Sequence, residues 1–309
     1  MNHFINFKGF SPEYLENIIN QTLEIKHNPA MYAKALEGKR MYMLFQKTST
    51  RTALSFVFGM TALGGQYIIQ NWEGSNFSVG EIQDEVRYVS RMADVIMARL
   101  KTNADINLMA KYSTVPVING CFNMYHPTQA IADLVTIKEF FGNLKVKLLY
   151  IGVRNNVLNS LMDSLPSLGG ELFAATPRIN EPSIDEDLYE IALQTGKFHD
   201  IGGGNPLIGE VKKIVKEVDV VYTDTCIDME FINDKAYEVL KEERTKKMLP
   251  FQINRELMQG SQAIVLHDMP IHTGYEISRE LVEEHIENIL QQAENKKYAA
   301  QSILMTLMK

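Results

Sequence analysis

The sequence predicts an α/β protein of two domains, each with a central parallel sheet flanked by helices, and with helices joining the domains. Two observations predict this fold class. Short apolar runs alternate with longer segments whose apolar residues recur at helical spacing, which is typical of βαβ units. The chain has 309 residues, and at about 100–200 residues per domain this length favours two domains over one.

Eight apolar runs are the expected strands, and a helical segment separates most of them. In chain order the runs are Met41–Phe45, Tyr67–Ile69, Val95–Ala98, Val115–Ile118, Val146–Gly152, Leu172–Ala175, Val220–Tyr222 and Ala263–Leu266. A further apparent strand precedes the three glycines at 202–204, which lack the spacing of a dinucleotide-binding fingerprint.

Two long helical patterns set the expected domain boundaries. The first runs from Pro127 to Phe141, stops at Gly142 and is followed at once by a strand. The second, Ser278 to Met308, allows one interruption and is expected to return to the first half of the chain. We therefore expect one domain of residues 1–142 plus 288–309 and another of residues 143–287.

Composition excludes several classes of protein. Lys and Arg number 31 against 38 Asp and Glu, and the net charge of −7 provides no general attraction for nucleic acid or an anionic membrane. The two cysteines, Cys121 and Cys226, are too few for a disulfide framework or a cysteine zinc cluster. Neither a secretory signal nor an apolar run long enough to span a bilayer is recognisable. We expect a cytoplasmic protein.

The segment Ser49-Thr50-Arg51-Thr52 directly follows the first expected strand and opens a helix. Hydroxyl groups, free N–H groups and a guanidinium at a helix N-terminus make a site for a phosphate-like anion. The alternative is that Ser49 or Thr50 only caps the helix while Arg51 is solvated. From these four residues alone, both interpretations stand.

A second motif, His126-Pro127-Thr128-Gln129, lies at another junction between a strand and a helix. Proline near the first helical position is normal at a helix start. His126 and Gln129 lie three residues apart, so both can face the same side of one helical turn. Taken alone, His126 is a structural residue. An anion site in the same half of the chain favours a functional role.

Together the two motifs resemble those of the carbamoyltransferase family, the aspartate and ornithine transcarbamylases. The resemblance extends over nearly the whole chain, and the ornithine-type members are the more similar. Five further segments carry it: 80–99 (GEIQDEVRYVSRMADVIMAR), 152–160 (GVRNNVLNS), 224–229 (DTCIDM), 267–270 (HDMP) and 292–296 (QAENK).

The resemblance implies a reaction and assigns roles to residues on the carbamoyl phosphate side. The domain of residues 1–142 plus 288–309 would bind carbamoyl phosphate, with Arg51, Arg99 and His126 as catalytic residues. Its binding residues would be Ser49, Thr50, Arg51, Thr52, Arg99, His126, Gln129 and Lys296, together with Trp72 from a neighbouring subunit. Simple packing is the alternative for Trp72. The family also implies a homotrimer with shared active sites, and neither a metal nor a cofactor.

Residues 143–287 would bind the acceptor. The implied contacts are Asn156, Asp224, Asp228, Met229, Asp268 and Met269. Aspartate is disfavoured as the acceptor, because Val79 and Asn156 stand where the aspartate enzymes carry a lysine and an arginine. Asp228 replaces a family serine and Asp268 a family cysteine, and two added carboxylates suit a more cationic or shorter amine. The alternative is that basic neighbours neutralise them or that they face solvent.

The expected function is therefore transfer of the carbamoyl group of carbamoyl phosphate to an amino group of ornithine or an ornithine-like amino acid, with release of phosphate. Two alternatives stay open. The acceptor can be another amine, such as a diamine or a different diamino acid. The chain can also be a weakly active paralog that binds carbamoyl phosphate, because Ala53 and Lys296 each replace a family arginine.

Overall fold

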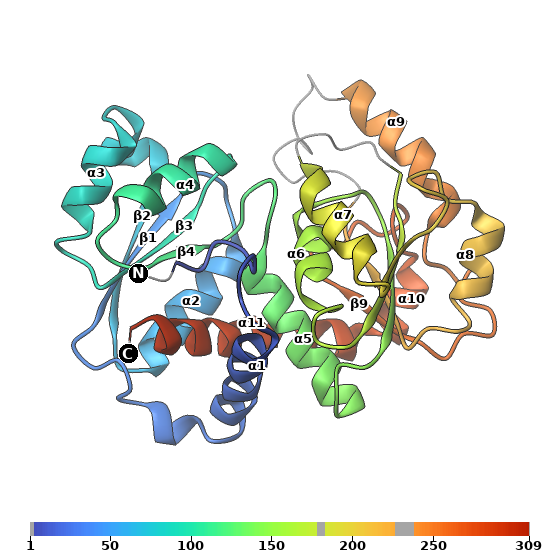
Figure 1. Cartoon of the computed structure of the whole chain (residues 1–309), viewed down its shortest axis with the longest axis horizontal. Helices are drawn as coiled ribbons and strands as arrows, with labels where there is room; N and C mark the ends of the chain where they lie inside the picture. The colour runs from blue at the N-terminus through green and yellow to red at the C-terminus, as the bar shows by residue number, and fades with distance from the viewer. Residues whose placement is uncertain (1–2, 178–182, 226–237, 309) are drawn as a thin grey trace. The chain divides into compact units, whose positions relative to one another are not determined.

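The computed structural model describes residues 3–177, 183–225 and 238–308. These residues form two compact units, unit 1 (1–136 and 294–309) and unit 2 (137–293). The chain passes between the units within two helices, α5 (Pro127–Phe141) and α11 (Ile286–Leu307), which are drawn in green and red in Figure 1. The boundaries expected from the sequence, 142/143 and 287/288, lie at the end of α5 and near the start of α11.

Unit 1 is built on a parallel sheet of four strands in the order β2-β1-β3-β4. The strands are β1 (Arg40–Phe45), β2 (Gln66–Asn71), β3 (Val95–Arg99) and β4 (Val117–Asn119). Strands β1 and β3 form the centre of the sheet and are buried along almost their whole length, whereas β2 is an exposed edge. A continuous apolar run is what a parallel strand with both faces covered requires.

Three helices of unit 1 connect its parallel strands and follow the handedness rule: α2 (Thr50–Ala62), α3 (Ile82–Val89) and α4 (Asn103–Tyr112). Helix α1 (Pro12–His27) precedes the first strand. The connection through α2 runs toward the β2 edge, whereas those through α3 and α4 run the opposite way. Right-handed crossovers then place α2 on one face of the sheet and α3 with α4 on the other, as Figure 1 shows.

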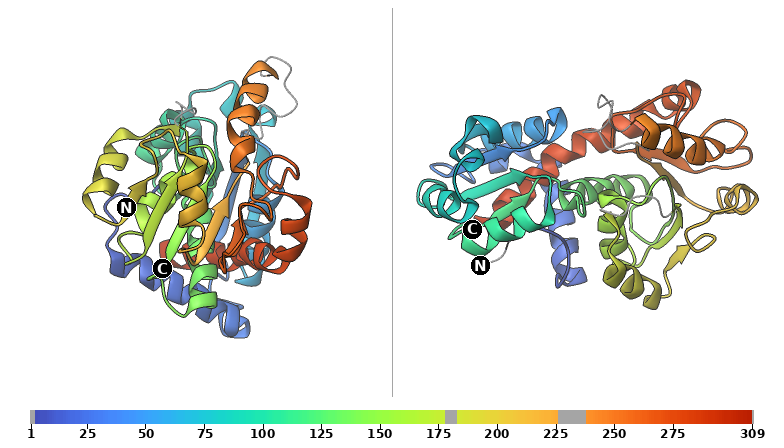
Figure 2. Two further views of the ribbon diagram at one scale, coloured as in Figure 1. Left: turned by 90° about the vertical axis from the view of Figure 1, so that its right-hand side faces the viewer. Right: turned by 90° about the horizontal axis from the view of Figure 1, so that it is seen from above.

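Unit 2 is built on a parallel sheet of five strands in the order β7-β6-β5-β8-β9. The strands are β5 (Lys147–Ile151), β6 (Glu171–Ala175), β7 (Phe198–Asp200), β8 (Val220–Thr223) and β9 (Ile264–His267). Its helices are α6 (Asn156–Ser164), α7 (Glu186–Gln194), α8 (Ile208–Ile214), α9 (Glu238–Met248) and α10 (Arg279–Glu284). Figure 2 shows this sheet and its helices from two further directions.

The expected fold class is confirmed, and most expected elements lie within a residue or two of their structural bounds. The helix expected from Pro127 to Phe141 is α5, with the same ends. The last helical segment is interrupted at His285, between α10 and α11, and residues 294–309 belong to unit 1. In the described part of the chain, no helix has the length and apolarity needed to cross a membrane.

Candidate functional site

The strand order of unit 1 reverses between β1 and β3, and ligands of parallel sheets bind outside the strand carboxyl ends at such a reversal. Phe45 and Arg99 are the last residues of these two strands and pair in register. The segment Ser49–Thr52 follows β1 after a short loop. The reversal therefore brings two of the predicted ligand-binding segments to one edge of the sheet.

Helix α2 begins immediately after Ser49, which is its N-cap. Ser49 has extended backbone angles, and its hydroxyl oxygen accepts a hydrogen bond from the N–H of Thr52 at 3.2 Å. The capping contact considered as the alternative is thus present. It does not exclude an anion at the same terminus, because one cap satisfies one of the several N–H groups in the first turn. Thr50 is exposed there and Arg51 is partly buried.

His126 lies between β4 and α5 and is 4% exposed. Burial, and then the positive charge of nearby side chains, hold the pKa of its imidazole well below the usual 6.5. The imidazole is therefore neutral at neutral pH. The charged neighbours, in order of decreasing effect, are Lys296, Arg99, Arg51 and Lys47. Four cations around one buried neutral group form a local positive field in a chain whose net charge is −7.

Lys47 is a residue that the two motifs do not identify. It is partly buried in the loop between β1 and Ser49. A lysine between a strand end and a predicted anion site is the signal that points to it. Lys296, which comes from α11 near the end of the chain, is 5% exposed and therefore places a second lysine charge in the same buried region.

Three buried polar atoms in this region have no hydrogen-bond partner in the described part of the chain. They are Oγ1 of Thr52, Nε of Arg99 and Oε1 of Gln129. Other atoms of two of these residues are held by the protein: Arg99 Nη1 donates to the carbonyl of Gly120 at 3.4 Å, and Gln129 Nε2 donates to Asp133 Oδ1 at 2.7 Å. Because buried polar groups are nearly always paired, this set requires polar atoms of a ligand or water.

Trp72 follows β2 directly and is partly buried. Its ring packs against Phe77 at a centroid distance of 5.8 Å, and Phe77 packs in turn against Tyr42 at 6.3 Å. Trp72 thus has a packing role within its own chain. Its contact with the ligand of a neighbouring subunit stays a prediction.

In unit 2 the strand order reverses between β5 and β8, whose ends pair in register at Ile151 and Thr223. Asn155 follows β5 and caps α6, accepting hydrogen bonds from two N–H groups at 3.1 and 3.0 Å. Its side-chain amide also donates to Asp224 Oδ2 at 2.5 Å. Asn155 therefore joins the carboxyl ends of β5 and β8, whereas the sequence predicted a functional contact, with the acceptor, only for its neighbour Asn156.

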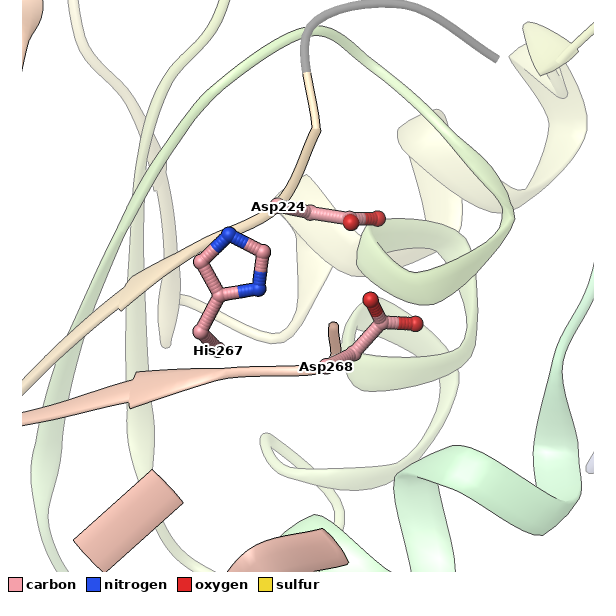
Figure 3. A group of neighbouring side chains, drawn as sticks. All are labelled: Asp224, His267 and Asp268. Atoms are coloured by element: carbon pink, nitrogen blue, oxygen red, sulfur yellow. The ribbon is translucent and has the colours of Figure 1, made fainter. Parts of the chain in front are cut away.

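Asp224 and Asp268 each follow the last residue of a strand, and these strands, β8 and β9, are neighbours that pair Thr223 with His267. Figure 3 shows the two carboxyl groups on the same side of the strand ends. Asp224 is 5% exposed, and one oxygen of its carboxyl group lies within 4.8 Å of an oxygen of the partly buried Asp268. Burial, followed by the nearby Asp268 carboxyl group, raises the pKa of Asp224 well above its usual 3.8.

Asp224, His267 and Asp268 each place one potential metal-binding atom within 4.8 Å of the others. Both nitrogens of His267, however, already have partners in the protein. Nε2 lies 3.1 Å from Glu276 Oε1, and Nδ1 accepts the N–H of Met269 at 2.8 Å. The group therefore offers an ion two carboxylates and no unengaged imidazole, a smaller set of ligands than the three or four of a typical zinc site.

The remaining predicted acceptor residues are placed as follows. Asn156 is the first residue of α6 and is partly buried. Met269 follows Asp268 and has a positive φ of 60°. Asp228 and Met229 lie outside the described residues, so their expected contacts stay predictions.

Two family profiles match the chain in succession. The profile described as "Aspartate/ornithine carbamoyltransferase, carbamoyl-P binding domain" matches residues 2–139. The profile described as "Aspartate/ornithine carbamoyltransferase, Asp/Orn binding domain" matches residues 144–307. Together they cover almost the whole sequence.

Individual ornithine carbamoyltransferases are also similar to this chain over most of its length. The anabolic ornithine carbamoyltransferase of Pyrococcus furiosus is 39% identical over 279 residues, covering 89% of this chain and 85% of the relative. The ornithine carbamoyltransferase of Moritella profunda is 33% identical and is covered completely, as is this chain. The crystal structure of the anabolic enzyme of Campylobacter jejuni superposes with a TM-score of 0.88 at 32% identity, over 99% of both chains.

Proposed function

This chain belongs to the aspartate/ornithine carbamoyltransferase family, and on that premise we propose that it transfers the carbamoyl group of carbamoyl phosphate to an amino group of ornithine, with release of phosphate. One observation carries the proposal: four cationic side chains surround the buried His126, where polar atoms of Thr52, Arg99 and Gln129 have no partner in the described protein. In the proposal, unit 1 binds carbamoyl phosphate and unit 2 binds the acceptor.

The phosphate group is bound at the N-terminus of α2. Its ligands in this proposal are Ser49, Thr50, Arg51 and Thr52, with Lys47 and Lys296 contributing charge. A helix N-terminus adds partial positive charge and N–H donors to these side chains. Lys296 supplies its charge from a single ammonium, which lacks the bidentate fork of the arginine that the family resemblance implies at this position.

The carbamoyl group is bound by Arg99, His126 and Gln129. Arg99 and a neutral His126 donate hydrogen bonds to the carbonyl oxygen, which gains negative charge as the amine attacks. For His126 this requires a proton on Nε2, and Thr128 Oγ1, 3.3 Å from Nδ1, supports that tautomer by donating to Nδ1. Fixed donors aimed at a developing oxyanion commonly contribute ~2.7–4 kcal/mol each. Gln129 Oε1, whose amide is oriented by Asp133, accepts from the carbamoyl NH₂.

The acceptor is bound by residues at the carboxyl ends of the unit 2 strands. Asp224 and Asp268 attract an ammonium group, and Asn156 and Met269 contribute polar backbone or side-chain contacts. Asp228 and Met229 belong to the same proposal by family resemblance. This pair of carboxyl groups, of which Asp224 is buried, opposes the binding of a dicarboxylate, which supports ornithine over aspartate.

The same proposal makes the enzyme a cytoplasmic homotrimer whose active sites are shared between neighbours. An apolar groove of about 420 Å³ lies along the edge strand β2 and helix α3 of unit 1. Among its lining residues Tyr67, Ile68, Tyr88 and Met92 are exposed, with Ile68 at 58% and Tyr88 at 64%. An exposed strand edge beside such a groove supports burial against another copy of the chain. Trp72 follows this strand directly.

The assay that tests the proposed function measures the ureido product formed from carbamoyl phosphate and a panel of amines. The panel contains L-ornithine, L-lysine, 1,4-diaminobutane and L-aspartate. We expect citrulline from ornithine, with a kcat/KM above those of the other amines. A preference for 1,4-diaminobutane or lysine would replace ornithine as the acceptor, and no product with any amine would favour a paralog that only binds carbamoyl phosphate.

A further inference from the structure

The carboxyl pair of unit 2, Asp224 and Asp268, has no cationic partner in the described part of the chain. The ion pairs of the described residues do not include either side chain. Asp224 accepts hydrogen bonds from the amide of Asn155 and from the N–H of Thr225 at 2.6 Å, and its carboxyl group lies within 4.8 Å of that of Asp268. A buried carboxylate beside a second, partly exposed one is costly without a counter-ion, unless a proton or a ligand cation compensates the charge.

Two carboxylates this close repel each other when both are ionised, and the burial of Asp224 makes a second charge there more costly. The ligand-free pair is therefore expected to hold one proton and to carry one negative charge. The raised pKa of Asp224 agrees with this protonation state. The two donors from Asn155 and Thr225 fix the Asp224 carboxyl in place, whereas Asp268 is partly exposed and accessible to a ligand.

We propose that Asp224 and Asp268 form an ammonium-binding subsite that holds one proton when empty and releases it to solvent when an ammonium group of the acceptor binds. The inference rests on the proposed function and deepens it, because it assigns Asp268 as a determinant of acceptor specificity. The charges balance. Before binding, the pair with its one proton carries −1 and the alkylammonium +1. After binding, the ionised pair together with the ammonium carries −1 and the released proton +1.

An ammonium fits this pair better than a metal ion. Both nitrogens of His267 are engaged by Glu276 and by the N–H of Met269, so His267 completes no metal set. The three N–H donors of an ammonium match the carboxylate oxygens, which are acceptors only when ionised. A cysteine, which the family resemblance implies at position 268, would lack this second carboxylate, so the expected proton release depends on Asp268.

Isothermal titration calorimetry of the full-length protein with two matched ligands tests the subsite. L-Norvaline is ornithine without its terminal amine, and 5-aminopentanoate is ornithine without its α-amine. Each is titrated at constant inorganic phosphate in two buffers of different ionisation enthalpy, at several pH values from about 5 to 8, which yields protons released per ligand bound. We expect one of the ligands to release up to about one proton, with the release falling as pH rises and the empty pair ionises.

The identity of the releasing ligand shows which ammonium occupies the subsite, and either result supports the proposal. Asp268→Asn should abolish the proton release and weaken the binding of that ligand about tenfold or more. Asp187→Asn removes an exposed carboxylate of unit 2 and is the control, which should change neither the release nor the affinity. Undiminished release in Asp268→Asn, or no release with either ligand in the wild type, would overturn the proposal. Citrulline formation by the same preparation is measured in parallel, so failure of the subsite is distinguishable from failure of the proposed activity.

Discussion

Arg51 lies in the first turn of α2 and is one of four cations that depress the pKa of His126. Arg51→Ala should weaken the binding of carbamoyl phosphate and of inorganic phosphate by ~1.5–3 kcal/mol, which is about 10- to 150-fold in Kd, because a charge-assisted hydrogen bond to the anion is lost. Arg91→Ala, which removes an exposed arginine of the same unit, is the control and should bind normally. Wild-type affinity of Arg51→Ala in calorimetry would remove Arg51 from the site.

His126 is buried and neutral, and its proposed contact strengthens as the carbonyl oxygen becomes negative. His126→Ala should therefore lower kcat by about 10²–10³ while changing KM much less. His126→Gln retains an N–H donor and should recover part of the loss. Steady-state kinetics with ornithine provide the measurement, and an unchanged kcat in His126→Ala would return this residue to a structural role.

Asp224 should limit the stability of the ligand-free protein at neutral pH. Its pKa is raised in the folded state, so the folded protein binds more protons than the unfolded chain above the usual value of 3.8, and stability falls as pH rises through that range. Asp268→Asn removes the repulsive charge and should raise Tm at pH 7 but not near pH 3.5. Thermal melts at the two pH values measure this, and an equal shift at both would indicate a change in packing instead.

At the scale of the element, the N-cap of α2 has two roles that can be separated. Ser49 accepts from the N–H of Thr52 at 3.2 Å, and Thr102 caps α4 in the same way, accepting from Asp105 at 3.1 Å. Ser49→Ala and Thr102→Ala should each lower the free energy of unfolding by about 1 kcal/mol. Denaturant melts measure this loss.

Phosphate binding distinguishes the two caps. Calorimetry should show weaker phosphate binding in Ser49→Ala, because its hydroxyl is proposed as a phosphate ligand. In Thr102→Ala we expect unchanged phosphate affinity. Equal affinities in the two variants would leave Ser49 with its capping role alone.

At the scale of the whole molecule, the exposed groove along β2 predicts association between copies. Ile68→Asp places a charge on this edge and should dissociate the proposed trimer, as measured by analytical ultracentrifugation. Ile191→Asp is the matched control, because Ile191 is 59% exposed on α7 in unit 2 and Ile68 is 58% exposed. Dissociation by both variants, or by neither, would place the interface elsewhere.

Local sequence by itself determined the fold class, most strand positions and the two motifs of unit 1. Apolar runs and helix boundaries are read from neighbouring residues, so Met41–Phe45 and Pro127–Phe141 could be located without a structure. The segment Ser49–Thr52 could be recognised for the same reason, since a strand end, a cap and an arginine stand within a few residues of one another.

Only the tertiary structure decided which distant residues meet. The sheet of unit 1 brings Lys47 near His126, and the return of α11 to unit 1 brings Lys296 there, although the three residues lie far apart in the chain. The strand order of unit 2 places Asp224 beside Asp268 at the ends of adjacent strands, which raises the pKa of Asp224. Charge and burial act through space, so the pKa of a carboxyl group depends on neighbours that the local sequence does not specify.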